Sequence, residues 1–166
     1  MSVATAEPPL EGSRAARAIV WGGLLAGVGD ITFAFVVNGL RGVGPVPVLQ
    51  SVAGGLLGVA ARDGGAATAA LGALLHFLIA FVWAAVFWLL SRRLGFMVRH
   101  PVVCGLLYGH EVYFFMYFVV LPLSAVYFNL TYTTYSVLLN SAGHMLLVGL
   151  PIALAASKFT NRTGRS

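Results

Sequence analysis

The stretch GGLLAGVGDITFAFVV, residues 22–37, consists almost entirely of apolar and small residues, yet Asp30 lies in its middle. It belongs to a longer apolar run over residues 18–40, and about 20 apolar residues are enough for a helix to cross a membrane. Three similar runs follow at residues 69–90, 102–123 and 135–156. All four are continuously apolar rather than alternating, and only helices or closed barrels satisfy the backbone in lipid. The sequence therefore predicts four transmembrane helices.

The composition excludes an ordinary water-soluble domain. Hydrophobic residues make up 59% of the 166 residues and charged residues 9%, whereas soluble domains carry about 25% charged residues. The mean hydropathy is +0.90. We expect the first run to be a membrane span rather than a cleaved signal peptide, because no A-x-A site follows it. The predicted fold class is all-α: an integral membrane four-helix bundle forming a single domain over residues 1–166, with short polar tails at 1–13 and 160–166.

The distribution of basic residues predicts the orientation. Cytoplasmic loops are enriched in Lys and Arg. An N-terminus inside places eight of the ten basic residues on the cytoplasmic side: Arg14, Arg17, Arg92, Arg93, Arg99, Lys158, Arg162 and Arg165. Only Arg41 and Arg62 then lie outside. Both termini are predicted to be cytoplasmic, and this placement explains the net charge of +5 without a nucleic-acid partner. Membrane lipid is the partner that the composition predicts.

The connector between the first and second runs is unusual because residues 42–61 carry no charge. Pro45 and Pro47 remove backbone donors near its start and leave about 14 helical residues, too few to cross a bilayer. A fifth span also distributes the basic residues less well between the two sides. We predict a re-entrant or interfacial helix over residues 46–61 on the outer side, and the sequence leaves the choice between the two open.

Each apolar run carries ionisable residues near its midpoint. At 1.5 Å per residue they lie within roughly 6 Å of one plane. They are Asp30, His76, His110, Glu111 and His144, with Asn140 on the same helix face as His144. An ionised carboxylate at the bilayer centre costs about 2.5–3.5 kcal/mol, so these groups are predicted to face inward, pair or become neutral. Neighbouring helical residues point about 100° apart, so one of His110 and Glu111 is expected to face the bundle axis and the other a neighbouring helix.

Two glycine pairs are predicted to allow close helix packing. Gly23 and Gly27 share a face with Asp30, and Gly105 and Gly109 lie in the third run. Both pairs have the small-xxx-small spacing that lets transmembrane helices approach closely.

The polar layer has several interpretations, which the sequence leaves open. It is either a structural network that selects helix neighbours, or a site for proton- or ion-linked transport. Axial ligation of haem by His76 and His144 is a further alternative, supported only by two histidines at similar depth. A carboxylate metal centre needs Glu-x-x-His on two helices, which this chain lacks. We therefore predict no metal, no cofactor and no catalytic residue, and leave enzyme activity undecided. Because one small copy encloses little room for a pathway, we also predict a homo-oligomer or a membrane partner subunit.

Four segments carry a resemblance to known proteins: VLQSVAGGLLG (48–58), LGALLHFLIAFVWAAVFW (71–88), LPLSA (121–125) and GHMLLVGLPIAL (143–154). The chain resembles small multi-span bacterial inner-membrane proteins to which no function is assigned. The resemblance extends from the first span to the last and implies a bacterial plasma-membrane location with four spans. It implies no catalytic residue.

Overall fold

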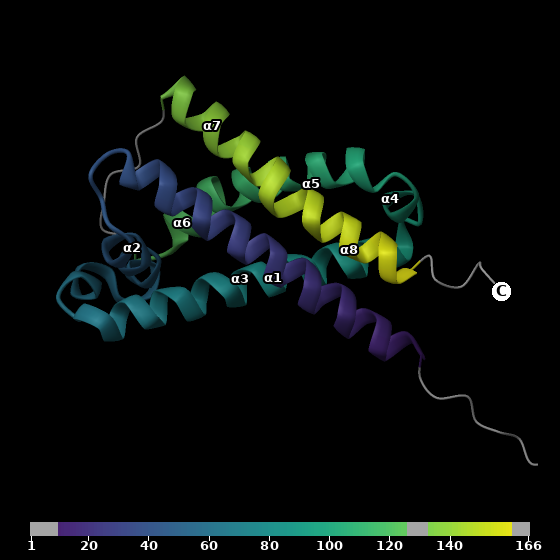
Figure 1. Cartoon of the computed structure of the whole chain (residues 1–166), viewed down its shortest axis with the longest axis horizontal. Helices are drawn as coiled ribbons and strands as arrows, with labels where there is room; N and C mark the ends of the chain where they lie inside the picture. The colour runs from purple at the N-terminus through teal and green to yellow at the C-terminus, as the bar shows by residue number, and fades with distance from the viewer. Residues whose placement is uncertain (1–9, 126–132, 161–166) are drawn as a thin grey trace, which may run out of the picture.

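The computed structural model describes residues 10–125 and 133–160, and every regular element within them is helical (Figure 1). The elements are α1 (Leu10–Gly39), α2 (Pro45–Leu57), the 3₁₀ helix η1 (Gly58–Arg62), α3 (Gly65–Arg93), α4 (Phe96–Arg99), α5 (Pro101–Phe115), the π-helical turn η2 (Met116–Val120), α6 (Leu121–Leu123), α7 (Thr134–His144), the π-helical turn η3 (Met145–Gly149) and α8 (Leu150–Thr160). The predicted all-α class is confirmed for this part of the chain.

Four helical stretches are long and apolar enough to cross a membrane: Gly12–Gly39, Gly65–Arg93, Pro101–Leu123 and Thr134–Thr160. The third consists of α5, η2 and α6, and the fourth of α7, η3 and α8. Each coincides with one of the four predicted apolar runs, and the helical hydrogen bonding continues for a few residues beyond most of the apolar ends. The prediction of four long apolar helices is therefore confirmed.

The long helices contact one another in a continuous set. α1 packs against both α3 and α8, and α5 packs against α7, η3 and α8. The start of α1, the end of α8 and the short α4 lie at one end of the molecule in Figure 1, with α2 at the opposite end. The side chains of Phe87 and Ile152 are fully buried in the apolar core, which also includes Trp88, Val98 and Phe159. This core fills the half of the molecule toward the α4 end.

The two π-helical turns are each followed closely by a proline. η2 is followed by Pro122, and η3 by Pro151. A proline inside a helix has no backbone N–H and crowds the carbonyl four residues earlier. A wider, π-helical turn before the proline relieves this crowding. π-helical turns occur often at functional sites. Here η3 follows His144 directly, so the irregular turn lies beside one of the predicted polar residues.

The connector forms the predicted short helix, although it ends earlier than expected. α2 begins at Pro45, where the missing N–H is not needed, and ends at Leu57, with Gly58 as its C-cap. Gly58 has φ +61° and ψ −140°, a backbone conformation that glycine adopts readily and that cannot continue an α-helix, and the chain continues as η1. Figure 1 shows α2 nearly end-on while α1 and α3 run across the picture, so α2 lies crosswise to the long helices.

Specific contacts hold α2 against α3 and α6. The amide of Gln50 donates hydrogen bonds to the Gly65 carbonyl at 3.1 Å and the Thr68 hydroxyl at 3.3 Å. Gly72 lies directly against the backbone carbonyl of Leu49, where a side chain would collide. The backbone N–H of Ala125 donates to the carbonyl of Gly55 at 2.9 Å. α2 therefore bridges the start of the second long helix and the end of the third.

Candidate functional site

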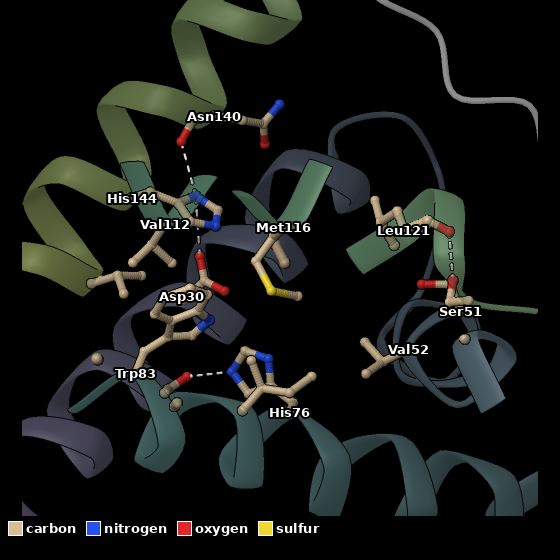
Figure 2. Close-up of a pocket in the computed structure, with 18 residues that line it drawn as sticks. Asp30, Ser51, Val52, His76, Trp83, Val112, Met116, Leu121, Asn140 and His144 are labelled. Atoms are coloured by element: carbon tan, nitrogen blue, oxygen red, sulfur yellow. Dashed lines mark hydrogen bonds and ion pairs between the residues drawn. The ribbon is translucent and has the colours of Figure 1, made fainter. Parts of the chain in front are cut away.

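A cavity of about 390 Å³ lies among the long helices and is bordered by α2 (Figure 2). Its polar lining residues are Asp30, Ser51, His76, Ser124, Asn140 and His144. Apolar side chains including Trp83 and Met116 form much of the remaining wall. This volume falls in the range of small-molecule sites and has room for on the order of ten waters. The cavity brings together polar residues from α1, α2, α3 and α7.

The closest pair of ionisable side chains in this cavity joins the first and fourth long helices. His144 Nδ1 lies 3.8 Å from Asp30 Oδ1 and 2.9 Å from the backbone carbonyl of Asn140. A carbonyl only accepts, so Nδ1 carries a proton, and in this tautomer of the imidazole Nε2 is an acceptor. No residue in 10–125 or 133–160 donates a hydrogen bond to the Asp30 carboxylate. Asp30 therefore presents a carboxyl group with unused acceptor capacity to the cavity.

His76 is oriented by a backbone hydrogen bond. Its Nε2 lies 2.9 Å from the carbonyl oxygen of Gly27, so Nε2 donates and Nδ1 remains an acceptor. Gly27 lies one helical turn before Asp30 on α1, which places the imidazole near the carboxylate. Figure 2 shows the side chains of His76, Asp30 and His144 projecting into the same space. The cavity thus contains one carboxyl group and two imidazoles.

His110 does not line this cavity. Its Nδ1 lies 2.8 Å from the hydroxyl oxygen of Ser141 on α7, and its ring packs on Phe114. The histidine therefore links the third long helix to the fourth, as a packing contact rather than as part of the central site.

Glu111 also lies outside the cavity, on the exposed face of α5. It borders a separate groove of about 310 Å³ with Trp83, Tyr108, Phe115 and Phe118. The structure therefore corrects the expectation that one of His110 and Glu111 faces the bundle axis. Gly109 faces the fourth helix, and Glu111 is two residues later, about 200° around the helix, so it points away.

The structure places both predicted glycine pairs at helix crossings. A Cβ on Gly27 would stand 2.7 Å from the ring of Phe77, and Gly23 lies against Phe81, both on α3. Gly105 would meet the Gly149 carbonyl at 2.9 Å, and Gly109 lies directly against the carbonyl of His144. The first pair sets the spacing of α1 and α3 beside the cavity, and the second sets that of α5 and the η3 region.

Sequence reasoning missed several residues of the cavity wall. Ser51, Trp83 and Met116 line it, but none is ionisable or at a helix midpoint, so no sequence signal marked them. Val112 and Val148 belong both to the cavity wall and to the buried apolar core. The site is therefore bounded by tightly packed side chains toward the α4 end and by α2 toward the other end.

The arrangement of the described His, Cys, Asp and Glu side chains does not favour a metal or haem site. Within the described residues, no group of three or more His, Cys, Asp or Glu side chains is arranged to hold a metal ion. His76 and His144 line one cavity, but Nε2 of His76 is already bonded to the Gly27 carbonyl rather than directed at a shared centre. The expectation that no cofactor binds stays a prediction.

Comparison of the chain with protein-family models, with curated proteins and with solved structures finds no match.

Proposed function

We propose that this chain is a multi-pass protein of the bacterial inner membrane that moves protons, or exchanges them for a small cation, through the cavity around Asp30. The observation that carries the proposal is the position of the Asp30 carboxylate on α1, where it lines a cavity and has an imidazole 3.8 Å away. Asp30 also lies one residue from the middle of the predicted apolar run 18–40. Intramembrane carboxylates are costly, and they commonly mark ion pathways and proton relays.

The orientation of the helices supports the membrane placement within this proposal. The described basic residues at the α4 end are Arg14, Arg17, Arg92, Arg93, Arg99 and Lys158. Arg41 and Arg62 belong to the opposite end, while Arg162 and Arg165 lie outside the described residues. By the positive-inside rule, the α4 end and both termini are cytoplasmic. The four long helices then form a bundle whose cavity lies between the middle and the outer side of the membrane.

The connector helix is proposed to be interfacial rather than re-entrant. α2 lies crosswise to the long helices, and its polar Gln50 is buried against α3 while Leu56 is exposed. A helix with this distribution of side chains lies in the membrane surface with its apolar side toward lipid. In this position α2 covers the outer end of the cavity through Ser51, Val52 and Gly55.

The chemistry of the site follows from how the Asp30 charge is neutralised. The carboxylate can hold a proton, pair with a protonated His144, or bind a cation that enters the cavity. These three states exclude one another at a single carboxyl group, so proton release and cation binding are linked. The acceptor nitrogens of the two imidazoles, Nδ1 of His76 and Nε2 of His144, can take up through cavity water the proton that Asp30 releases.

Proton flux in proteoliposomes tests this function. A pH-sensitive dye inside the vesicles reports the flux driven by an imposed potential, for the wild type, Asp30→Asn and Glu111→Gln. Glu111→Gln is a matched control, because it also removes one carboxyl group from the middle of a long helix but outside the cavity. We expect Asp30→Asn to abolish the flux and Glu111→Gln to retain it. Equal flux in all three proteins, or no flux in the wild type with either a proton or an alkali-cation gradient, contradicts the proposal.

A second candidate role, partner binding, is favoured by the position of Glu111. A carboxylate that faces lipid acyl chains costs about 2.5–3.5 kcal/mol when ionised. We propose that a second copy of the chain or a membrane partner subunit covers the groove formed by Glu111, Trp83, Tyr108 and Phe118. The protein mass in detergent tests this: we expect a complex for the wild type and a lighter species for Glu111→Leu. A monomeric wild type without a copurifying subunit contradicts it.

A further inference from the structure

A second, larger groove runs along the outer surface of the first and fourth long helices. Its volume is about 760 Å³, and α1, η3 and α8 form its walls. The apolar lining includes Trp21, Leu25, Leu147, Leu150 and Leu154, while Arg17 and Lys158 line its cytoplasmic end. This groove is separate from the cavity around Asp30, and no step of the proposed proton pathway uses it.

The length of the groove matches one leaflet of a bilayer. Along α1 it extends from Arg17 to Gly29. Twelve residues of α-helix span about 18 Å, and half of a hydrocarbon core is about 15 Å thick. Gly29 lies at the middle of the predicted first span, so the groove begins at the cytoplasmic interface and ends near the midplane. A single acyl chain of the inner leaflet has this reach.

The charge of the groove favours an anionic headgroup. Its described lining residues are apolar, small or basic, so no carboxylate there opposes an anion. Arg17 and Lys158 are both exposed, and Arg17 makes one long hydrogen bond, 3.4 Å, to the Ser13 hydroxyl. That contact leaves most of the donors of the guanidinium available. Basic pockets between transmembrane helices on the cytoplasmic side are suited to anionic lipid headgroups.

A glycine maintains the inner end of the groove. Gly29 faces Leu147, and a Cβ at this position would stand 3.2 Å from the Leu147 carbonyl oxygen and 3.3 Å from its Cβ. The helices therefore meet closely at the midplane. The groove closes there, as a site for one acyl chain requires.

We infer that the groove between α1 and α8 binds an anionic phospholipid of the cytoplasmic leaflet. Arg17 and Lys158 contact its phosphate, and one acyl chain lies along Trp21, Leu25, Leu150 and Leu154. The inference rests on the proposed membrane insertion and its cytoplasmic α4 end, but not on the proposed movement of protons.

Native mass spectrometry of the full chain tests the inference. The protein in mild detergent is titrated with phosphatidylglycerol and, separately, with phosphatidylcholine of the same acyl chains. The test variant is the double substitution Arg17→Gln with Lys158→Gln. The matched control, Arg93→Gln with Arg99→Gln, removes the same charge from exposed residues at the same end of the molecule but outside the groove. Thermal unfolding of each variant verifies that it is folded.

We expect one phosphatidylglycerol to bind the wild type at least about tenfold more tightly than phosphatidylcholine. Each basic residue near a membrane surface contributes about 1 kcal/mol, so the groove variant should lose about thirtyfold in affinity. The control should lose less than about threefold. Leu25→Trp, which fills the groove while keeping both charges, should also weaken binding.

Three outcomes overturn the inference. If both double variants lose the same affinity for phosphatidylglycerol, the lipid is attracted only by the overall charge of the basic end. Equal binding of both lipids removes the anionic headgroup from the site. Full competition by inorganic phosphate shows an anion site that does not recognise the lipid chain. None of these outcomes affects the flux measured with Asp30→Asn, so the two proposals fail independently.

Discussion

The Nδ1 atom of His144 lies 3.8 Å from Oδ1 of Asp30 and 2.9 Å from the carbonyl oxygen of Asn140. One nitrogen thus lies near two acceptors, one on its own helix and one on α1. His76, on α3, reaches α1 in turn through the carbonyl of Gly27. Three of the long helices therefore contribute an ionisable side chain to the wall of one cavity: Asp30, His76 and His144.

The imidazole of His144 is predicted to be needed for proton movement. Histidine changes its charge between about pH 5 and 8, whereas glutamine hydrogen-bonds without titrating. His144→Gln should lower proton flux in proteoliposomes by at least about tenfold, in keeping with the loss of a general acid–base group. His110→Gln is the matched control, since His110 bonds to Ser141 outside the cavity. If His110→Gln loses more proton flux than His144→Gln, His144 is not the imidazole that proton movement needs.

Gly109 is predicted to tolerate no side chain. Its missing Cβ would lie directly against the His144 carbonyl, so Gly109→Ala forces α5 away from η3. Overpacking of this kind costs about 1–3 kcal/mol, or a fall in Tm of about 2–10 °C for a chain of this size. Thermal unfolding in detergent measures it. Gly95→Ala is the control, because nothing lies within 4 Å of that position. A Tm in Gly109→Ala equal to that of Gly95→Ala would show that the crossing is looser than described.

The hydroxyl of Thr68 is predicted to hold the connector in place. It donates to the carbonyl of the buried residue Ala61 at 2.7 Å and accepts from Gln50. Thr68→Val keeps the shape but leaves the carbonyl without its donor, at a cost of about 1–3 kcal/mol. Amide exchange in α2 and η1 should accelerate about tenfold or more.

The control for this experiment is Thr32→Val. Thr32 is exposed and donates within its own helix to Val28. Faster exchange in α2 and η1 with Thr32→Val, or no change with Thr68→Val, contradicts the assigned role of the hydroxyl.

The orientation is tested by reporter fusions. An alkaline phosphatase or fluorescent reporter placed after Ser166 should report the cytoplasm, and one inserted within residues 129–134 should report the outer side. Most of this second site lies outside the described residues. In the predicted topology, the C-terminus is cytoplasmic and the connector between the third and fourth spans lies outside. Reporter signals from the same side of the membrane at both positions contradict this topology.

The absence of haem is tested by an absorption spectrum. We expect the protein purified from haem-replete cells to show no Soret band. A Soret band that disappears in both His76→Ala and His144→Ala would instead assign the two imidazoles as axial ligands.

Much of the fold was predictable because it depends on local composition. In lipid, the backbone N–H and C=O groups have no water to bond to, so apolar runs of about 20 residues form helices in which these groups bond to one another. The four long helices therefore follow directly from the sequence. A short helix over residues 46–61 was also predictable, although α2 includes both prolines and begins at Pro45. Its end was not predictable, because the connector contains several glycines and the sequence does not mark Gly58 as the one that adopts a positive φ.

The composition of the site depends instead on the rotation of each helix about its axis. The sequence placed Asp30, His76, His110, Glu111 and His144 at one depth, but depth does not decide which way a side chain points. The packing of Gly105 and Gly109 against η3 turns α5 so that His110 meets Ser141 and Glu111 faces outward. The sequence by itself therefore determined the long helices and the positions of the polar groups along them. Only the tertiary structure decided that Asp30, His76 and His144 share a cavity, because close contacts between helices set their rotation.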